Sequence, residues 1–151
     1  MLNNKVMKKS ILIVLSCCFL LSNCSVNNST SSSPQNVKYF WHLINVTGGI
    51  AGVDWEFNVN TIVWDFDADA GTLTVENNNT DDNIEDGLDS GIYEYYEIST
   101  DNVTYLVVDD IELGSLEIVN NQLKINQNEM TTGTVSDGYI YTFQVEIITV
   151  D

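Results

Sequence analysis

The chain has 151 residues, and its 22 acidic residues against five lysines and no arginine give a formal net charge of −17 at pH 7. The electrostatic field of such a negative protein repels nucleic acids and anionic surfaces. Without arginine, the chain also lacks the bidentate guanidinium groups with which many enzymes bind carboxylates and phosphates. Nucleic-acid binding is therefore excluded, and the length predicts a single domain.

The N-terminus has the pattern of a secretory signal. Three lysines precede the apolar run 11–21, and Leu21-Ser22-Asn23-Cys24 follows as a small-residue cleavage site. A cysteine at the first mature position resembles the lipobox of bacterial lipoproteins, which implies an acyl chain such as palmitate on Cys24. The run of about 11 residues is shorter than the roughly 20 of a transmembrane helix. We predict a lipoprotein signal peptide over 1–23; the alternative is a soluble secreted protein with an ordinary cleavage site.

Removal of the signal changes both charge and cysteine chemistry. Residues 24–151 hold all 22 acidic residues and two lysines, which gives a formal charge of −20. Cys17 and Cys18 lie in the signal, so a lipid on Cys24 leaves no thiol for a disulfide, a metal or a nucleophile. His42 is the sole histidine, which excludes metal sites with two imidazoles. We predict a non-enzymatic protein without a cofactor.

Beyond the polar stretch 24–36, which predicts a flexible tether, the pattern is almost wholly that of β-strands. Apolar residues alternate with polar ones, and turn signals such as Ala70-Gly71 and Asp137-Gly138 separate the segments. The alternation predicts an all-β domain over 37–151 with eight strands, at 37–46, 60–67, 72–77, 91–99, 103–109, 112–119, 122–126 and 138–149.

Short connections between these strands favour sequential antiparallel pairing, and eight such strands can close into an up-and-down barrel. A sandwich of two sheets is the alternative, because periodicity alone does not separate the two. The glycine-rich segment 47–52 is expected to form an Ω-like lid, with Trp55 capping one end of the barrel. The segment 77–90 is expected to be an exposed acidic loop.

Four segments carry a resemblance to a known family. They are FWHLINVTGGIAG at 40–52, TIVWDFD at 61–67, GIYEY at 91–95 and DGYIYTF at 137–143. Together they resemble the lipocalin-like lipoproteins of the Bacteroidetes. The resemblance implies a lipocalin-like barrel and a cavity for a small molecule, without a known activity.

Six aromatic residues are expected to share the inner face of the barrel. In a narrow barrel they form the core, whereas in a wider one they line an apolar cavity for a small hydrophobic ligand. They are Trp41, Trp64, Tyr93, Tyr95, Tyr141 and Phe143. His42 falls on the opposite face, where it is expected to be exposed or partly packed rather than catalytic.

Carboxylates offer weaker candidates. Asp65, Asp67 and Asp69, with Glu76 further on, superficially match a calcium loop, but the alternation favours a hairpin with outward carboxylates and a turn near Ala70-Gly71. The acidic loop 77–90 supports an alternative function, an envelope module that contacts a protein partner or calcium. Paired carboxylates of a glycoside hydrolase are a remoter alternative.

The leading expectation combines these observations. It is a monomeric lipoprotein of the outer membrane, anchored by lipid, that binds a small hydrophobic ligand without catalysis. The periplasmic face of the membrane is favoured over the cell surface, because no acidic run follows Cys24.

Overall fold

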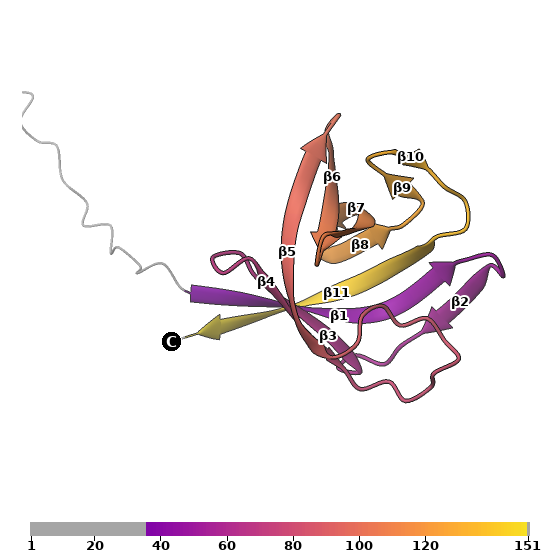
Figure 1. The fold of residues 1–151 in the computed structure, drawn as a ribbon. Coiled ribbons are helices and arrows are strands. Elements are labelled where there is room, and N and C mark those ends of the chain that lie inside the picture. The colour runs from indigo at the N-terminus through magenta and orange to yellow at the C-terminus, as the bar shows by residue number, and fades with distance from the viewer. Residues whose placement is uncertain (1–35, 151) are drawn as a thin grey trace, which may run out of the picture. The chain divides into compact units, whose positions relative to one another are not determined.

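The structure, a computed structural model, describes residues 36–150 and consists of strands joined by turns and loops (Figure 1). The predicted signal peptide 1–23, the lipid site Cys24 and most of the tether lie outside the described residues. No helix occurs in 36–150, so this part of the chain has none that could cross a membrane. The strands are β1 (Asn36–Gly48), β2 (Val53–Glu56), β3 (Ile62–Asp67), β4 (Thr72–Asn77), β5 (Gly91–Thr100), β6 (Val103–Val108), β7 (Ile111–Val119), β8 (Gln122–Asn126), β9 (Glu129–Met130), β10 (Gly133–Thr134) and β11 (Tyr139–Val150).

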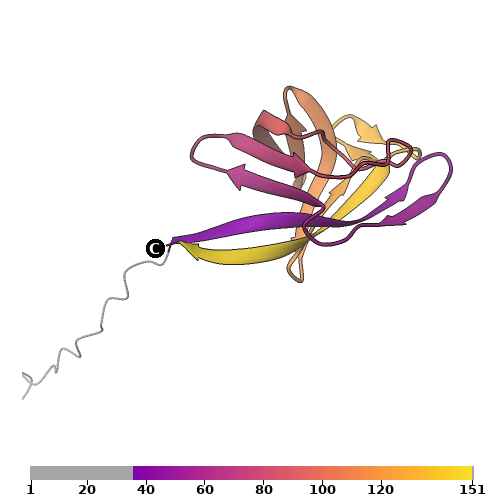
Figure 2. The ribbon, with the colours of Figure 1, turned by 90° about the horizontal axis from the view of Figure 1, so that it is seen from below.

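Eight of these strands form a closed antiparallel barrel. Each pairs with its neighbour in the order β1-β3-β4-β5-β6-β7-β8-β11, and β11 returns to pair with β1 along its whole length. Figure 2 shows β1 and β11 side by side, running beyond the rest of the barrel at one end. Closure leaves no exposed edge around the barrel wall. The predicted up-and-down barrel of eight strands is therefore confirmed.

The alternation of apolar residues sets which side chains enter the core. Fourteen apolar side chains are buried, and the largest that are less than 2% exposed include Trp64 and Phe143. A bulge at Ile44, between the pairs Leu43–Phe143 and Asn45–Thr142, shifts the register of β1 by one residue. Because of the bulge, both Leu43 and Val46 point inward, and each is fully buried.

The glycine-rich segment after the first predicted strand differs from the expectation of an Ω-like lid. The strand β1 continues to Gly48, and a tight turn leads to β2, which pairs with the end of β1. Gly49 and Gly52 have φ of 66° and 62°, a backbone conformation that glycine adopts without strain, so the turn is a hairpin. Trp55 therefore lies on a strand and stacks on Tyr139, with ring centroids 6.4 Å apart.

Candidate functional site

The six aromatic residues predicted for the inner face all belong to the core or pack against it. Trp41, Trp64, Tyr141 and Phe143 are at most 8% exposed, and Tyr93 and Tyr95 are half-buried against them. The rings of Trp64 and Phe143 are in contact, with centroids 4.8 Å apart. The structure therefore brings the predicted residues together as packing, and their role in ligand binding stays a prediction.

One end of the barrel interior carries a polar network that involves the acidic loop. The hydroxyl of Tyr141 donates to Glu85 at 2.7 Å, and Glu85 also accepts from the backbone N–H of Gly87. Burial, with the carboxylate of Glu85 beside it, raises the pKa of Tyr141 far above its ordinary value. Beneath this loop the indole N–H of Trp64 is buried and lacks a hydrogen-bond partner within residues 36–150.

The loop between β4 and β5 is therefore partly buried, whereas the sequence predicts an exposed loop. Residues 84–88 are half-buried, Leu88 packs against the core, and Asn79 donates to Asp86 at 2.8 Å. The predicted exposure holds for Asp81, Asp82 and Asp89. Hydrogen bonds from the side chain and backbone of Asn83 lower the pKa of Asp81. Several carboxylates of the loop thus accept hydrogen bonds from other groups of the same loop.

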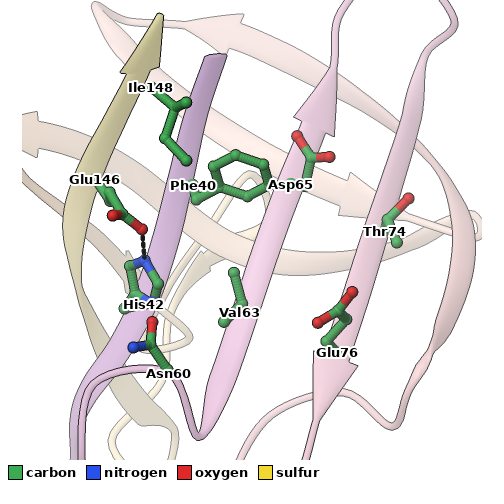
Figure 3. Close-up of a pocket in the computed structure, with 9 residues that line it drawn as sticks. All are labelled: Phe40, His42, Asn60, Val63, Asp65, Thr74, Glu76, Glu146 and Ile148. Carbon is green, nitrogen blue, oxygen red and sulfur yellow. Dashed lines mark hydrogen bonds and ion pairs between the residues drawn. The ribbon is translucent and has the colours of Figure 1, made fainter. Parts of the chain in front are cut away.

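A groove of about 280 Å³ lies on the outer face of the barrel wall (Figure 3). Four neighbouring strands, β11, β1, β3 and β4, supply eight of its nine lining residues, and Asn60 on the loop before β3 supplies the ninth. The strand register arranges the eight as cross-strand neighbours on one face: Phe40 lies opposite both Glu146 and Asp65, and Val63 lies opposite both His42 and Glu76. Thr74 and Ile148 complete the wall.

His42 is buried, contrary to the expectation that it is exposed or partly packed. It is 3% exposed, and its Nε2 lies 3.1 Å from a carboxylate oxygen of Glu146, 104 residues away in the sequence. Since the carboxylate accepts, Nε2 carries a proton in this contact. Nδ1 is shielded from solvent and has no hydrogen-bond partner within 36–150. The pairing of β1 with β11 that closes the barrel brings Glu146 beside His42, which accounts for this contact.

Asp65 is held by an ion pair with Lys38 at the same face. The ammonium group of Lys38 also lies 4.9 Å from the centroid of the Phe40 ring, within reach of a cation–π interaction. Lys38 pairs with Oδ2 of Asp65. The other carboxylate oxygen, Oδ1, is buried and has no hydrogen-bond partner in the described part of the chain. Asp65 is therefore a partly desolvated carboxylate in the wall of the groove.

The carboxylates considered for calcium do not converge. Asp67 accepts from the backbone N–H groups of Asp69 and Ala70, which builds the turn between β3 and β4. This arrangement is the predicted hairpin with outward carboxylates and a turn near Ala70-Gly71. Among the described residues, no three His, Cys, Asp or Glu side chains are placed to hold a metal ion together.

A second groove, of about 640 Å³, lies along β6, β7 and β8 and is lined mainly by polar side chains. It contains no aromatic side chain, whereas the groove at β1 combines an aromatic ring and aliphatic side chains with three carboxylates. An apolar surface with a few polar groups is the usual composition of a small-molecule site. The groove at β1, here called the outer groove, is the stronger candidate.

Comparisons of the chain with protein-family models, with curated proteins and with solved structures found no match. The candidate site therefore depends on geometry alone. Its residues are the outward-facing partners of the predicted core residues, so the alternation in the sequence already carried a signal for them. The local sequence pattern gave no signal for the pairing of β11 with β1, because these strands lie at the two ends of the domain.

Proposed function

We propose that this chain is a non-catalytic binding protein of the cell envelope, held by a lipid on Cys24, and that it binds a small molecule with a short apolar body in the outer groove. The groove itself is the observation that carries the proposal, because it joins Phe40, Val63 and Ile148 to polar side chains in one concave surface. Its volume of about 280 Å³ is just below the roughly 300–1,000 Å³ of pockets for drug-sized ligands. A short ligand is therefore the better fit.

The barrel interior supports this function less well than the outer groove. A ligand there would have to displace side chains such as Trp64 and Phe143, which are less than 2% exposed. Opening that space costs packing energy that a small ligand must first recover. The indole N–H of Trp64, which has no hydrogen-bond partner in residues 36–150, favours an interior guest.

Calorimetric titration of the full chain with n-hexanol tests the binding site. Val63→Asn places a polar amide in the groove wall and is expected to weaken binding, as is Ile148→Asn. Val135→Asn is the matched control, because Val135 is exposed and lies outside the groove. Thermal unfolding of each variant establishes that it is folded. Equal binding of n-hexanol by all variants, or no binding of n-hexanol or of charged ligands with the same six-carbon chain, would contradict the proposal.

The anchor is tested separately. We expect the protein recovered from the membrane of a bacterium that processes lipoproteins to begin at Cys24 and to carry acyl chains detectable by mass spectrometry. Cys24→Ser is expected to leave the signal uncleaved and the chain without lipid. Cleavage at another position, with no lipid on Cys24, would show that the protein is secreted by the ordinary route. Protease treatment of intact cells then distinguishes the proposed periplasmic face from the surface.

A further inference from the structure

The charges around the outer groove point to the class of molecule that it takes. Three carboxylates, on Asp65, Glu76 and Glu146, line the groove, and Lys38 is the one cation beside it among the described residues. In the described part of the chain, no hydrogen bond or ion pair holds the side chain of Glu76, and the carboxylate of Glu146 is hydrogen-bonded only to His42. We infer that the groove binds an organic cation, an ammonium group on a short apolar chain. The inference rests on the proposed function and names its ligand.

The groove already shows this chemistry with a group of its own chain. Lys38 is an alkylammonium, and its charged end lies over the ring of Phe40 and pairs with Asp65. Phe40 and Asp65 both line the groove (Figure 3). The same aromatic face and carboxylate that hold an internal ammonium group therefore form one wall of the site. Glu146 on β11 and Glu76 on β4 lie on the two outer strands of the groove, one on each side of it (Figure 3), and offer carboxylates to a second ammonium group.

Two polar atoms in the wall of the groove are buried, and the remaining charges decide the sign of the potential there. Nδ1 of His42 and Oδ1 of Asp65 are shielded from water and lack a hydrogen-bond partner within residues 36–150. The two residues are diagonal neighbours across the β1–β3 pair, since His42 lies opposite Val63 and Asp65 lies two residues beyond it. Lys38 already pairs with Asp65, so the other two groove carboxylates, Glu76 and Glu146, carry the negative charge that no lysine offsets within residues 36–150. Both favour a cation in the groove.

A bare metal ion is a poorer occupant than an organic cation. Divalent ions in proteins need several oxygen ligands directed at one point. In residues 36–150 no three candidate ligands are so placed, because the groove carboxylates come from different strands and surround an apolar strip. An ammonium group is satisfied by one or two carboxylates and an aromatic face, and its chain covers the apolar residues.

Three ligands with the same six-carbon chain test the inference in the full-length protein. We expect n-hexylammonium to bind roughly tenfold more tightly than n-hexanol, and n-hexanoate to bind more weakly than either. Added salt is expected to weaken the binding of n-hexylammonium and to leave that of n-hexanol nearly unchanged. Binding of n-hexanol as tight as that of n-hexylammonium would overturn the inference and leave the proposed function standing. Failure of all three to bind would overturn both.

Variants of the carboxylates locate the charge effect. Glu76→Gln and Glu146→Gln are each expected to weaken the binding of n-hexylammonium by about fivefold and to leave n-hexanol unaffected. Glu97→Gln is the matched control, because Glu97 is an exposed carboxylate on β5 outside the groove. Equal effects of all three substitutions would show a general effect of net charge and would overturn the assignment to this groove.

Discussion

Two faces of the same strands behave in opposite ways, and the contrast is sharpest at Val63 and Trp64. Trp64 points inward, lies opposite Trp41 and is 1% exposed. Val63, one residue earlier, points outward, lies opposite His42 and lines a groove with three carboxylates. Because successive side chains of a strand point to opposite faces, adjacent residues form an apolar inner face and a charged outer face of the barrel. The comparison teaches that the inner face supplies the packing, whereas the outer face forms the groove in which we propose that a ligand binds.

The largest expected effect comes from the inner face. Trp64→Ala removes a fully buried aromatic side chain, so we expect the free energy of unfolding to fall by about 3–5 kcal/mol. Val63→Ala, the neighbouring change on the outer face, is expected to cost about 1 kcal/mol or less. Urea unfolding of both variants measures the difference. Similar losses for the two would remove the energetic distinction between the faces.

A smaller effect is expected where the loop covers the inner face. Tyr141→Phe deletes the hydroxyl that donates to Glu85 and accepts from Gln127. Because a carboxylate then loses a buried donor, we expect a loss of about 1–3 kcal/mol. Tyr96→Phe, at an exposed tyrosine, is the control with an expected change near zero. If Tyr141→Phe is also neutral, the loop does not depend on this bond.

Alkaline pH probes the same tyrosine. Burial and Glu85 raise the pKa of Tyr141 in the folded protein, whereas the unfolded chain titrates near the ordinary value of 10. Above that pH the unfolded state binds fewer protons than the folded state, so the free energy of unfolding falls as pH rises. We expect Tyr141→Phe to make this decline shallower and Tyr96→Phe to leave it unchanged. Parallel declines in all three proteins would contradict the raised pKa.

The smallest effect on stability is expected on the outer face. Lys38→Met removes an ion pair whose lysine is half-exposed, so the free energy of unfolding should change by no more than about 1 kcal/mol. The same change frees Asp65 and Phe40, and we therefore expect n-hexylammonium to bind more tightly. Thermal unfolding and calorimetry measure the two effects. A large loss of stability, or weaker binding, would show that the outer face is a structural element instead.

The sequence predicted the fold well because the alternation is local. All eight predicted strands correspond to strands of the barrel, and the six aromatic residues fall on the predicted face. The missed strand β2 is short and follows a glycine-rich turn, so its alternation covers too few residues to be distinguished from a loop. The same brevity applies to β9 and β10, of two residues each.

The candidate site was harder to predict because it depends on contacts between distant parts of the chain. The bond between His42 and Glu146 joins residues 104 positions apart, and that between Tyr141 and Glu85 joins residues 56 apart. Neither follows from local periodicity. The burial of His42 and the packing of the acidic loop therefore emerge only when β11 closes the barrel against β1.

One spectrum tests the central claim that the outer groove, and not the barrel interior, is the binding site. The methyl signals of Val63 and Ile148 report on the groove, and the indole N–H signal of Trp64 reports on the interior. During titration of the isotope-labelled full chain with n-hexylammonium, we expect the methyl signals to shift with saturation while the indole signal stays in place. A shift of the Trp64 indole signal with unchanged methyl signals would place the ligand inside the barrel and contradict the account.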